Sequence, residues 1–216
     1  TTANDTGANA TTGGSYAAEL ADGGGLSLRE AVALAGARPG GATIRFAAGV
    51  STVTFTSLTI ASDITIDTDA QSAMTIEGSF DIASGKTLTL SNGAGDNLTL
   101  SGQITGSSGT LAKTGSGTLT LAGVYNAYGA DQGTFGSLVG VSLAEGTTLA
   151  VSATKTLENS ITLDGSATID TGDATLTLKG VMYGHGGLIK AGNGTLVVGY
   201  NDFTGTVTTT VSGGTL

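Results

Sequence analysis

From Ala42 onward, apolar residues occupy every second position in short stretches of the chain. The residue between two apolar ones is usually Thr, and Gly, Asn, Asp and Ser separate one stretch from the next. A period of two with polar punctuation is typical of strands that bury one face and expose the other. The stretches are Ile44/Phe46, Val53/Phe55, Leu58/Ile60, Ile64/Ile66, Met74/Ile76, Phe80/Ile82, Leu88/Leu90, Leu98/Leu100, Leu119/Leu121, Val141/Leu143, Leu149/Val151, Ile161/Leu163, Leu176/Leu178, Leu196/Val198 and Val207/Val211.

These strands are too short and too closely spaced for an antiparallel sandwich, whose strands are usually longer. A parallel β-helix, in which short strands stack as rungs about 4.8 Å apart around an aliphatic column, fits them better. With roughly 20 residues per rung, the chain from Ala42 to Leu216 would form about eight or nine rungs and a rod of about 40 Å. The low aromatic content, 5%, agrees with an aliphatic interior.

The only convincing helix is predicted over Leu26–Ala37. Ser27 and Glu30 have the spacing of a capping box, in which each side chain binds the other residue's backbone N–H. Leu28 and Val32 belong to an apolar stripe at helical spacing. We therefore predict an N-terminal segment over residues 1–41, in which Ser27, Leu28, Glu30 and Val32 form a structural cap, and a solenoid over 42–216. Within this segment, Tyr16–Leu20 could add one short strand or turn.

A longer repeat overlies the strand pattern. The stretch Gly109–Leu121 returns as Gly186–Val198, 77 positions later, with Leu, Lys, two Gly and Gly-Thr-Leu in the same order. Self-similarity of this kind is typical of a repeat architecture. With roughly 20 residues per rung, the 77-residue period corresponds to three or four rungs.

Composition narrows the classes of function. A net charge of −9 disfavours nucleic acid and anionic membrane surfaces as partners. The chain has no Cys, so disulfides do not stabilise it. No apolar run approaches the roughly 20 residues of a membrane-spanning helix. The first residue is Thr rather than Met, from which we expect a removed leader or an excised piece of a longer protein.

Two segments resemble known bacterial families. Leu188, Lys190, Gly192, Gly194–Leu196, Val198, Tyr200–Gly205, Thr208, Val211 and Gly214–Leu216 resemble the autotransporter-associated β-strand repeat of large surface and secreted adhesins; a second copy starts at Leu111. Leu26–Val32 is similar to the Ser-Leu-Arg-Glu-Ala segment that begins many secreted β-helix proteins.

The resemblance implies an all-β, right-handed parallel β-helix, export to the surface of a Gram-negative cell and a parent protein that continues beyond Leu216. It brings no catalytic residues. The Asn-Pro motifs of two-partner-secretion haemagglutinins are absent from the chain.

Few residues of the chain are candidates for catalysis or for binding a metal or ligand. The carboxylates Asp63, Asp67, Asp69, Glu77 and Asp81 lie close in sequence, but no Lys or Arg accompanies them as a polysaccharide lyase would need, so we interpret them as turn residues. The single Gly93–Asp96 segment partly resembles a calcium-binding repeat, which needs stacked copies. His185 is predicted in an exposed turn. Threonine pairs at Thr87/Thr89, Thr118/Thr120 and Thr175/Thr177 are too irregularly spaced for an ice-binding face. We predict no catalytic residue, metal or cofactor.

The candidate for recognition is an insert in the first copy of the repeat, Tyr125–Gly140. It carries Tyr125, Tyr128 and Phe135, and aromatic side chains on a loop suit contacts with sugars or proteins. Two hypotheses follow. In the first, the chain is a non-enzymatic adhesin rod whose partner is a host or cell-surface protein or glycan, or another copy of itself. In the second, it is a carbohydrate-active β-helix enzyme.

Overall fold

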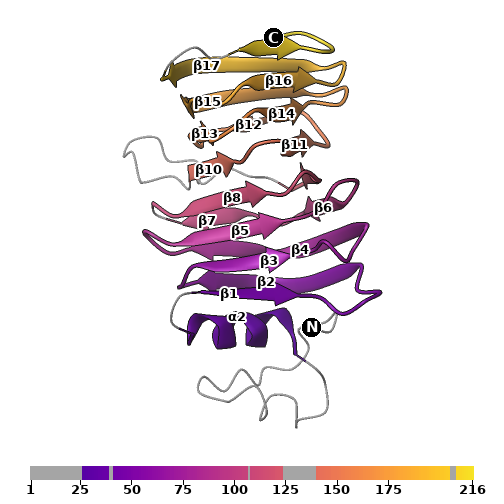
Figure 1. The fold of residues 1–216 in the computed structure, drawn as a ribbon, viewed down its shortest axis with the longest axis vertical. Coiled ribbons are helices and arrows are strands. Elements are labelled where there is room, and N and C mark those ends of the chain that lie inside the picture. Colours follow the sequence, from indigo (N-terminus) through magenta and orange to yellow (C-terminus); the bar gives the residue numbers. More distant parts are fainter. Residues whose placement is uncertain (1–25, 39–40, 107, 124–139, 205–207) are drawn as a thin grey trace.

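The structure, a computed structural model, describes residues 26–38, 41–106, 108–123, 140–204 and 208–216. They form a parallel β-solenoid of about seven turns with one short helix at one end of the rod (Figure 1). The predicted parallel β-helix is therefore confirmed. The right-handed winding stays a prediction from the resemblance.

In the described ranges, one helix and eighteen strands follow one another. They are α2 (Leu28–Gly36), β1 (Ala42–Arg45), β2 (Thr52–Ile60), β3 (Ile64–Asp67), β4 (Ala73–Ile82), β5 (Thr87–Ser91), β6 (Asn97–Leu100), β7 (Ile104–Gly106), β8 (Thr110–Thr114), β9 (Thr118–Leu121), β10 (Gly140–Leu143), β11 (Thr148–Val151), β12 (Lys155–Leu157), β13 (Ile161–Leu163), β14 (Ala167–Asp170), β15 (Thr175–Gly184), β16 (Leu188–Ala191), β17 (Thr195–Phe203) and β18 (Thr209–Val211).

Parallel pairing between successive turns builds three ladders along the rod. The first ladder joins β1, β3, β5, β8, β10, β13 and the later halves of β15 and β17. The second joins the start of β2 and of β4 with β6, β9, β11, β14, β16 and β18. The third contains the ends of β2 and β4 with β7, and then β12 with the start of β15 and of β17.

The interior is a single aliphatic column. Every predicted apolar pair from Ile44/Phe46 to Leu176/Leu178 is buried at both positions, because each in-register turn places its apolar side chains on those of the turn before. Phe55 and Phe80 meet edge to face with ring centroids 5.2 Å apart. The prediction that Val211 of the pair Val207/Val211 is buried was wrong, because Val211 is 48% exposed. Val207 lies outside the described residues. Val211 pairs with Lys190, and no described turn covers it.

The predicted number of rungs, eight or nine, was too high. Outside the insert, residues paired between successive turns are 19 to 24 positions apart, because each turn contains three strand segments and their corners. The insert before Gly140 lengthens one turn further, since Leu111 pairs with Val141.

The two copies of the long sequence repeat are separated along the rod by three turns and one ladder position. Its first copy passes from β8 in the first ladder to β9 in the second. Its second copy passes from β16 in the second ladder to β17 in the third. The same sequence motif therefore builds two different corners of the rod.

Helix α2 packs at one end of the rod against β1, β2 and β3 (Figure 1). Ser27 is its N-cap, and the predicted capping box is present: the Glu30 N–H donates to Ser27 Oγ at 3.3 Å, and the Ser27 N–H donates to Glu30 Oε2 at 2.7 Å. Leu28 and Val32 are buried in the same apolar cluster as the first turns. The boundary between residues 1–41 and 42–216 and the capping role of α2 stay predictions.

Glycine is required where the backbones of successive turns meet at a bend. A Cβ at Gly102 would lie 1.9 Å from the Gly78 carbonyl oxygen, and a Cβ at Gly123 would lie 2.1 Å from that of Ser101. Neither contact is possible, so these bends accept no side chain.

We expect Gly102→Ala to lower the free energy of unfolding by about 3 kcal/mol or more, because backbone on both turns must move to admit the methyl group. Gly140→Ala is the matched control, since its Cβ would meet nothing closer than 3.9 Å, and it should cost less than about 1 kcal/mol. Urea unfolding measures both variants. Equal losses would contradict the close approach at Gly102.

Leu28→Ala should cost about 2–4 kcal/mol if α2 closes the aliphatic column, because Leu28 is almost fully buried against it. Ser27→Ala should cost only about 1 kcal/mol through loss of the helix cap. Thermal and urea unfolding compare the two. A Leu28→Ala variant as stable as the unsubstituted chain would show that the helix is an appendage.

Candidate functional site

The candidate site is the base of the insert, where the chain leaves β9 after Gly123 and returns at Gly140. The two neighbouring ladders continue without interruption: β8 pairs with β10, and β9 pairs with β11, both in register. The Gly140 N–H donates to the Gly109 carbonyl at 2.9 Å and fixes the point of return. The strands on either side of residues 124–139 are thus paired in register.

Lys155 holds the other side of this base. Its ammonium donates to the carbonyl oxygens of Leu121 at 2.6 Å and Gly123 at 2.9 Å, directly where the insert departs. Burial lowers the pKa of Lys155 below its ordinary value, because the charged form loses hydration. The two bonds satisfy carbonyl groups at the exit of the insert.

Lys155 belongs to the third ladder. Among the described residues, no strand joins β7 to β12 in this ladder. Lys155 is in register with the buried Leu176 of the next turn. Its position in the strand therefore faces the interior, and its Nζ reaches the carbonyl oxygens of Leu121 and Gly123 in the preceding turn.

The three aromatic residues predicted for binding, Tyr125, Tyr128 and Phe135, all lie outside the described residues. The structure places the two ends of their segment, Gly123 and Gly140, after the second ladder of one turn and at the first ladder of the next, and it does not test their role. The cap residues Ser27, Leu28, Glu30 and Val32 lie at the far end of the described rod and take no part in this base.

Two other lysines, Lys113 and Lys190, occupy inward positions of the aliphatic column and are fully buried. Lys113 is in register with Leu90 and Leu143. Its Nζ donates to the carbonyls of Thr114 at 2.5 Å and Gly115 at 2.7 Å. Burial lowers the pKa of Lys113 to about 8, although the negative charge of Asp69 opposes the shift.

Lys190 occupies the equivalent position in the second copy of the repeat, at a different corner of the rod. Its Nζ donates to the carbonyls of Ala191 at 2.6 Å, Gly192 at 2.8 Å and Gly213 at 3.1 Å. We had not predicted these lysines as interior residues. The signal was present, because Leu111/Lys113 and Leu188/Lys190 have the same two-residue spacing as the buried apolar pairs.

The acidic residues from Asp63 to Asp81 are engaged locally, as turn and ladder residues. Asp63 Oδ1 accepts from the Thr87 N–H at 2.8 Å, and Asp67 pairs with Arg45 at 2.8 Å. Two threonine hydroxyls bind carboxylates of this group: Thr54 Oγ1 donates to Glu77 Oε2 at 3.1 Å, and Thr105 Oγ1 donates to Asp81 Oδ1 at 3.3 Å. The Asp69 N–H donates to Asp67 Oδ1 at 3.0 Å. Within the described ranges, no three His, Cys, Asp or Glu side chains gather as metal ligands would.

The remaining sequence candidates are spread over the rod. His185 is exposed in a turn, as predicted, and its backbone N–H donates to the Leu163 carbonyl at 3.2 Å. Gly93–Asp96 is a corner closed by the bond from the Asp96 N–H to the Gly93 carbonyl at 3.1 Å. The three threonine pairs belong to β5, β9 and β15, one in each ladder, so they do not share a face.

Comparison with known proteins adds no relative: no protein family, no curated protein and no solved structure matches this chain. In the part of the chain that the structure describes, no helix is long and apolar enough to cross a membrane.

We expect the stability contribution of Lys113 to depend on pH. Because its folded-state pKa is about 8 and its ordinary value is 10.5, the unfolded chain binds more protons between these values, and stability rises with pH there. The free energy of unfolding of the unsubstituted chain, relative to Lys113→Met, should increase between pH 7.5 and 10.5 by up to about 3 kcal/mol.

The control is Lys179→Met. Lys179 lies on the surface beside Glu158, and its side chain is 60% exposed. The difference in the free energy of unfolding between the unsubstituted chain and Lys179→Met should therefore not rise over this pH range. Urea unfolding at a series of pH values measures both differences. A flat difference for Lys113→Met would show that its ammonium is hydrated in the folded protein.

Proposed function

We propose that this chain is a non-enzymatic β-solenoid segment of a bacterial adhesin, secreted or displayed on the surface of a Gram-negative cell, that presents the insert after Gly123 from a rigid rod. The observation that best supports this proposal is that the first two ladders pair in register on both sides of the insert. A scaffold that keeps its register on both sides of a long insertion supports the insertion without depending on it.

The electrostatics of the base support this function. Lys155 neutralises the carbonyl dipoles at the exit, and the Gly140–Gly109 bond fixes the return. With both ends held by buried or ladder contacts, the insert loses less conformational freedom on binding a partner than a free loop would. Its aromatic residues would then supply the contact area for a protein or glycan of the cell surface.

The acidic surface fits the same proposal. A net charge of −9 favours solubility and disfavours non-specific adsorption to nucleic acid or anionic lipid. We propose no cofactor and no insertion of this segment into a membrane.

The test replaces Tyr125, Tyr128 and Phe135 together by Ala and measures binding to cultured epithelial cells and to a panel of immobilised glycans. The triple variant should bind at least about tenfold more weakly, because aromatic anchors carry most binding energy at such contacts. Its melting temperature should stay unchanged, because the base of the insert is intact.

Tyr183→Ala with Tyr200→Ala is the matched control, since these tyrosines are 40% and 65% exposed on the body of the rod. This double variant should bind like the unsubstituted chain. The proposal would be contradicted if the unsubstituted chain did not bind, or if both variants lost the same amount of binding. Release of reducing ends from acidic polysaccharides would favour the enzyme hypothesis instead.

A further inference from the structure

The outer face of the second ladder carries a two-column arrangement of short side chains, which we call the threonine array. Over β4, β6, β9, β11 and β14, outward residues of successive turns are paired in register, and six of the ten positions are Thr. The first column is Ala73, Asn97, Thr118, Thr148 and Thr168, and the second is Thr75, Thr99, Thr120, Ala150 and Asp170.

The spacing of threonines along the chain hides this array. Of the three Thr-x-Thr pairs, only Thr118/Thr120 belongs to this face. The other members are single threonines of different turns, such as Thr75 and Thr99, and the insert separates Thr118 from Thr148 in sequence. Parallel pairing brings them into columns because it aligns equivalent residues of turns that differ in length.

The hydroxyl groups of the array have no hydrogen-bond partner among the described residues. The buried hydroxyls of Thr68, Thr147 and Thr171, in contrast, donate to carbonyls at the corners of the rod. All six threonines of the array are half-buried, since the short side chains of neighbouring turns shield their flanks. Branching at Cβ restricts their rotamers, so the hydroxyl and methyl groups are ordered before a partner binds.

The array is nearly free of charge. It contains no Lys, Arg or Glu, and its one carboxylate, Asp170, lies at one end of the second column. There Asp170 Oδ1 accepts from the Gly172 N–H at 2.8 Å. Removing water from hydroxyl and methyl groups costs less free energy than removing it from ionic groups. The face therefore suits an extended, uncharged and regularly ordered partner.

The spacing of the array indicates which partner this is. Outward residues lie about 4.8 Å apart between turns and about 6.6 Å apart along a strand. Water molecules joined tetrahedrally by hydrogen bonds of about 2.75 Å repeat at about 4.5 Å between second neighbours and at about 7.3 Å along the hexagonal axis of ice. The two pairs of spacings agree within about 1 Å, a difference that rotation of each hydroxyl can absorb.

We propose that the threonine array binds ice, so that the rod adheres to a crystal face of water as well as to the partner of its insert. The hydroxyls take the place of water oxygens at the crystal surface, and the methyl groups lie between them. Each contact is weak, but the rigid ladder makes all of them at once, so their effects multiply. The array uses no residue of the insert, and this proposal therefore stands apart from the proposed function.

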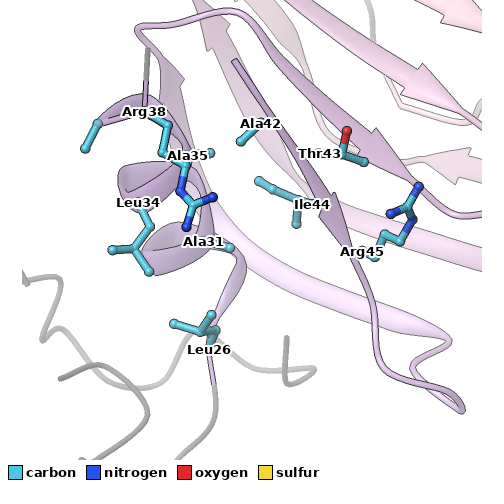
Figure 2. Close-up of a pocket in the computed structure, with 10 residues that line it drawn as sticks. Leu26, Ala31, Leu34, Ala35, Arg38, Ala42, Thr43, Ile44 and Arg45 are labelled. Atoms are coloured by element: carbon cyan, nitrogen blue, oxygen red, sulfur yellow. The ribbon is translucent and has the colours of Figure 1, made fainter. Parts of the chain in front are cut away.

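The first ladder offers a matched control face. Thr43, Thr65 and Thr89 also stack in register on its outer side. Figure 2 shows Thr43 and Arg45 on the side of β1 that faces away from α2. Arg45 pairs with Asp67 at 2.8 Å beside this column of threonines. This face thus has threonines in register, but it lacks the uncharged second column.

Ice-affinity partitioning of the full chain tests the proposal. A slowly growing ice layer should take up the unsubstituted chain. Thr99→Lys with Thr148→Lys should reduce this uptake at least about tenfold, because two long charged side chains hold the array away from the crystal. The control, Thr43→Lys with Thr89→Lys, should be taken up like the unsubstituted chain. Melting temperatures check that both variants fold.

A second variant keeps the test independent of folding. Thr99→Val with Thr148→Val removes only two hydroxyls and should reduce uptake severalfold, but less than the lysine variant does. Absence of uptake of the unsubstituted chain would overturn the proposal, and so would an equal loss in the variants of the two ladders. Loss of uptake in the triple alanine variant of Tyr125, Tyr128 and Phe135 would overturn it too, because ice would then bind the insert. Retained uptake in that variant, with cell binding lost, would support both proposals separately.

Discussion

Parallel hydrogen bonding between successive turns is the interaction on which the rest of this structure depends. It fixes the separation of equivalent residues at about 4.8 Å along the rod, so each side chain stacks on its counterparts above and below. An inward position must therefore be apolar in turn after turn, as in the series Ile44, Ile66, Leu90 of the first ladder. The same spacing leaves no room for a side chain where Gly102 crosses Gly78.

The corners pose a different problem, because the chain turns there and several of its carbonyl groups come together inside the rod. Three lysines solve it by placing an ammonium against two or three such carbonyls. Burial of the amine costs free energy, as the lowered pKa of Lys113 shows, and the hydrogen bonds to the corner carbonyls offset part of that cost. Buried cations thus belong to the way this solenoid turns its corners.

This arrangement also explains how the rod tolerates an insert. The first two ladders pair across it, and the long side chain of Lys155 reaches back to the carbonyls of Leu121 and Gly123. The two turns that flank the insert keep their register in both ladders. A binding element at such a place can change without cost to the aliphatic column.

The sequence by itself determined the fold class, because a period of two with Thr outward and Gly-rich corners favours stacked short strands. It also determined the capped start of the helix at Ser27 and Glu30, since that signal is local. It did not determine the number of residues per turn, which depends on corner geometry. Nor did it show that Lys113 and Lys190 point inward, since a lysine is ordinarily expected at the surface. Only the tertiary structure decided these points, because the carbonyls that bind those lysines become neighbours only when the corners close.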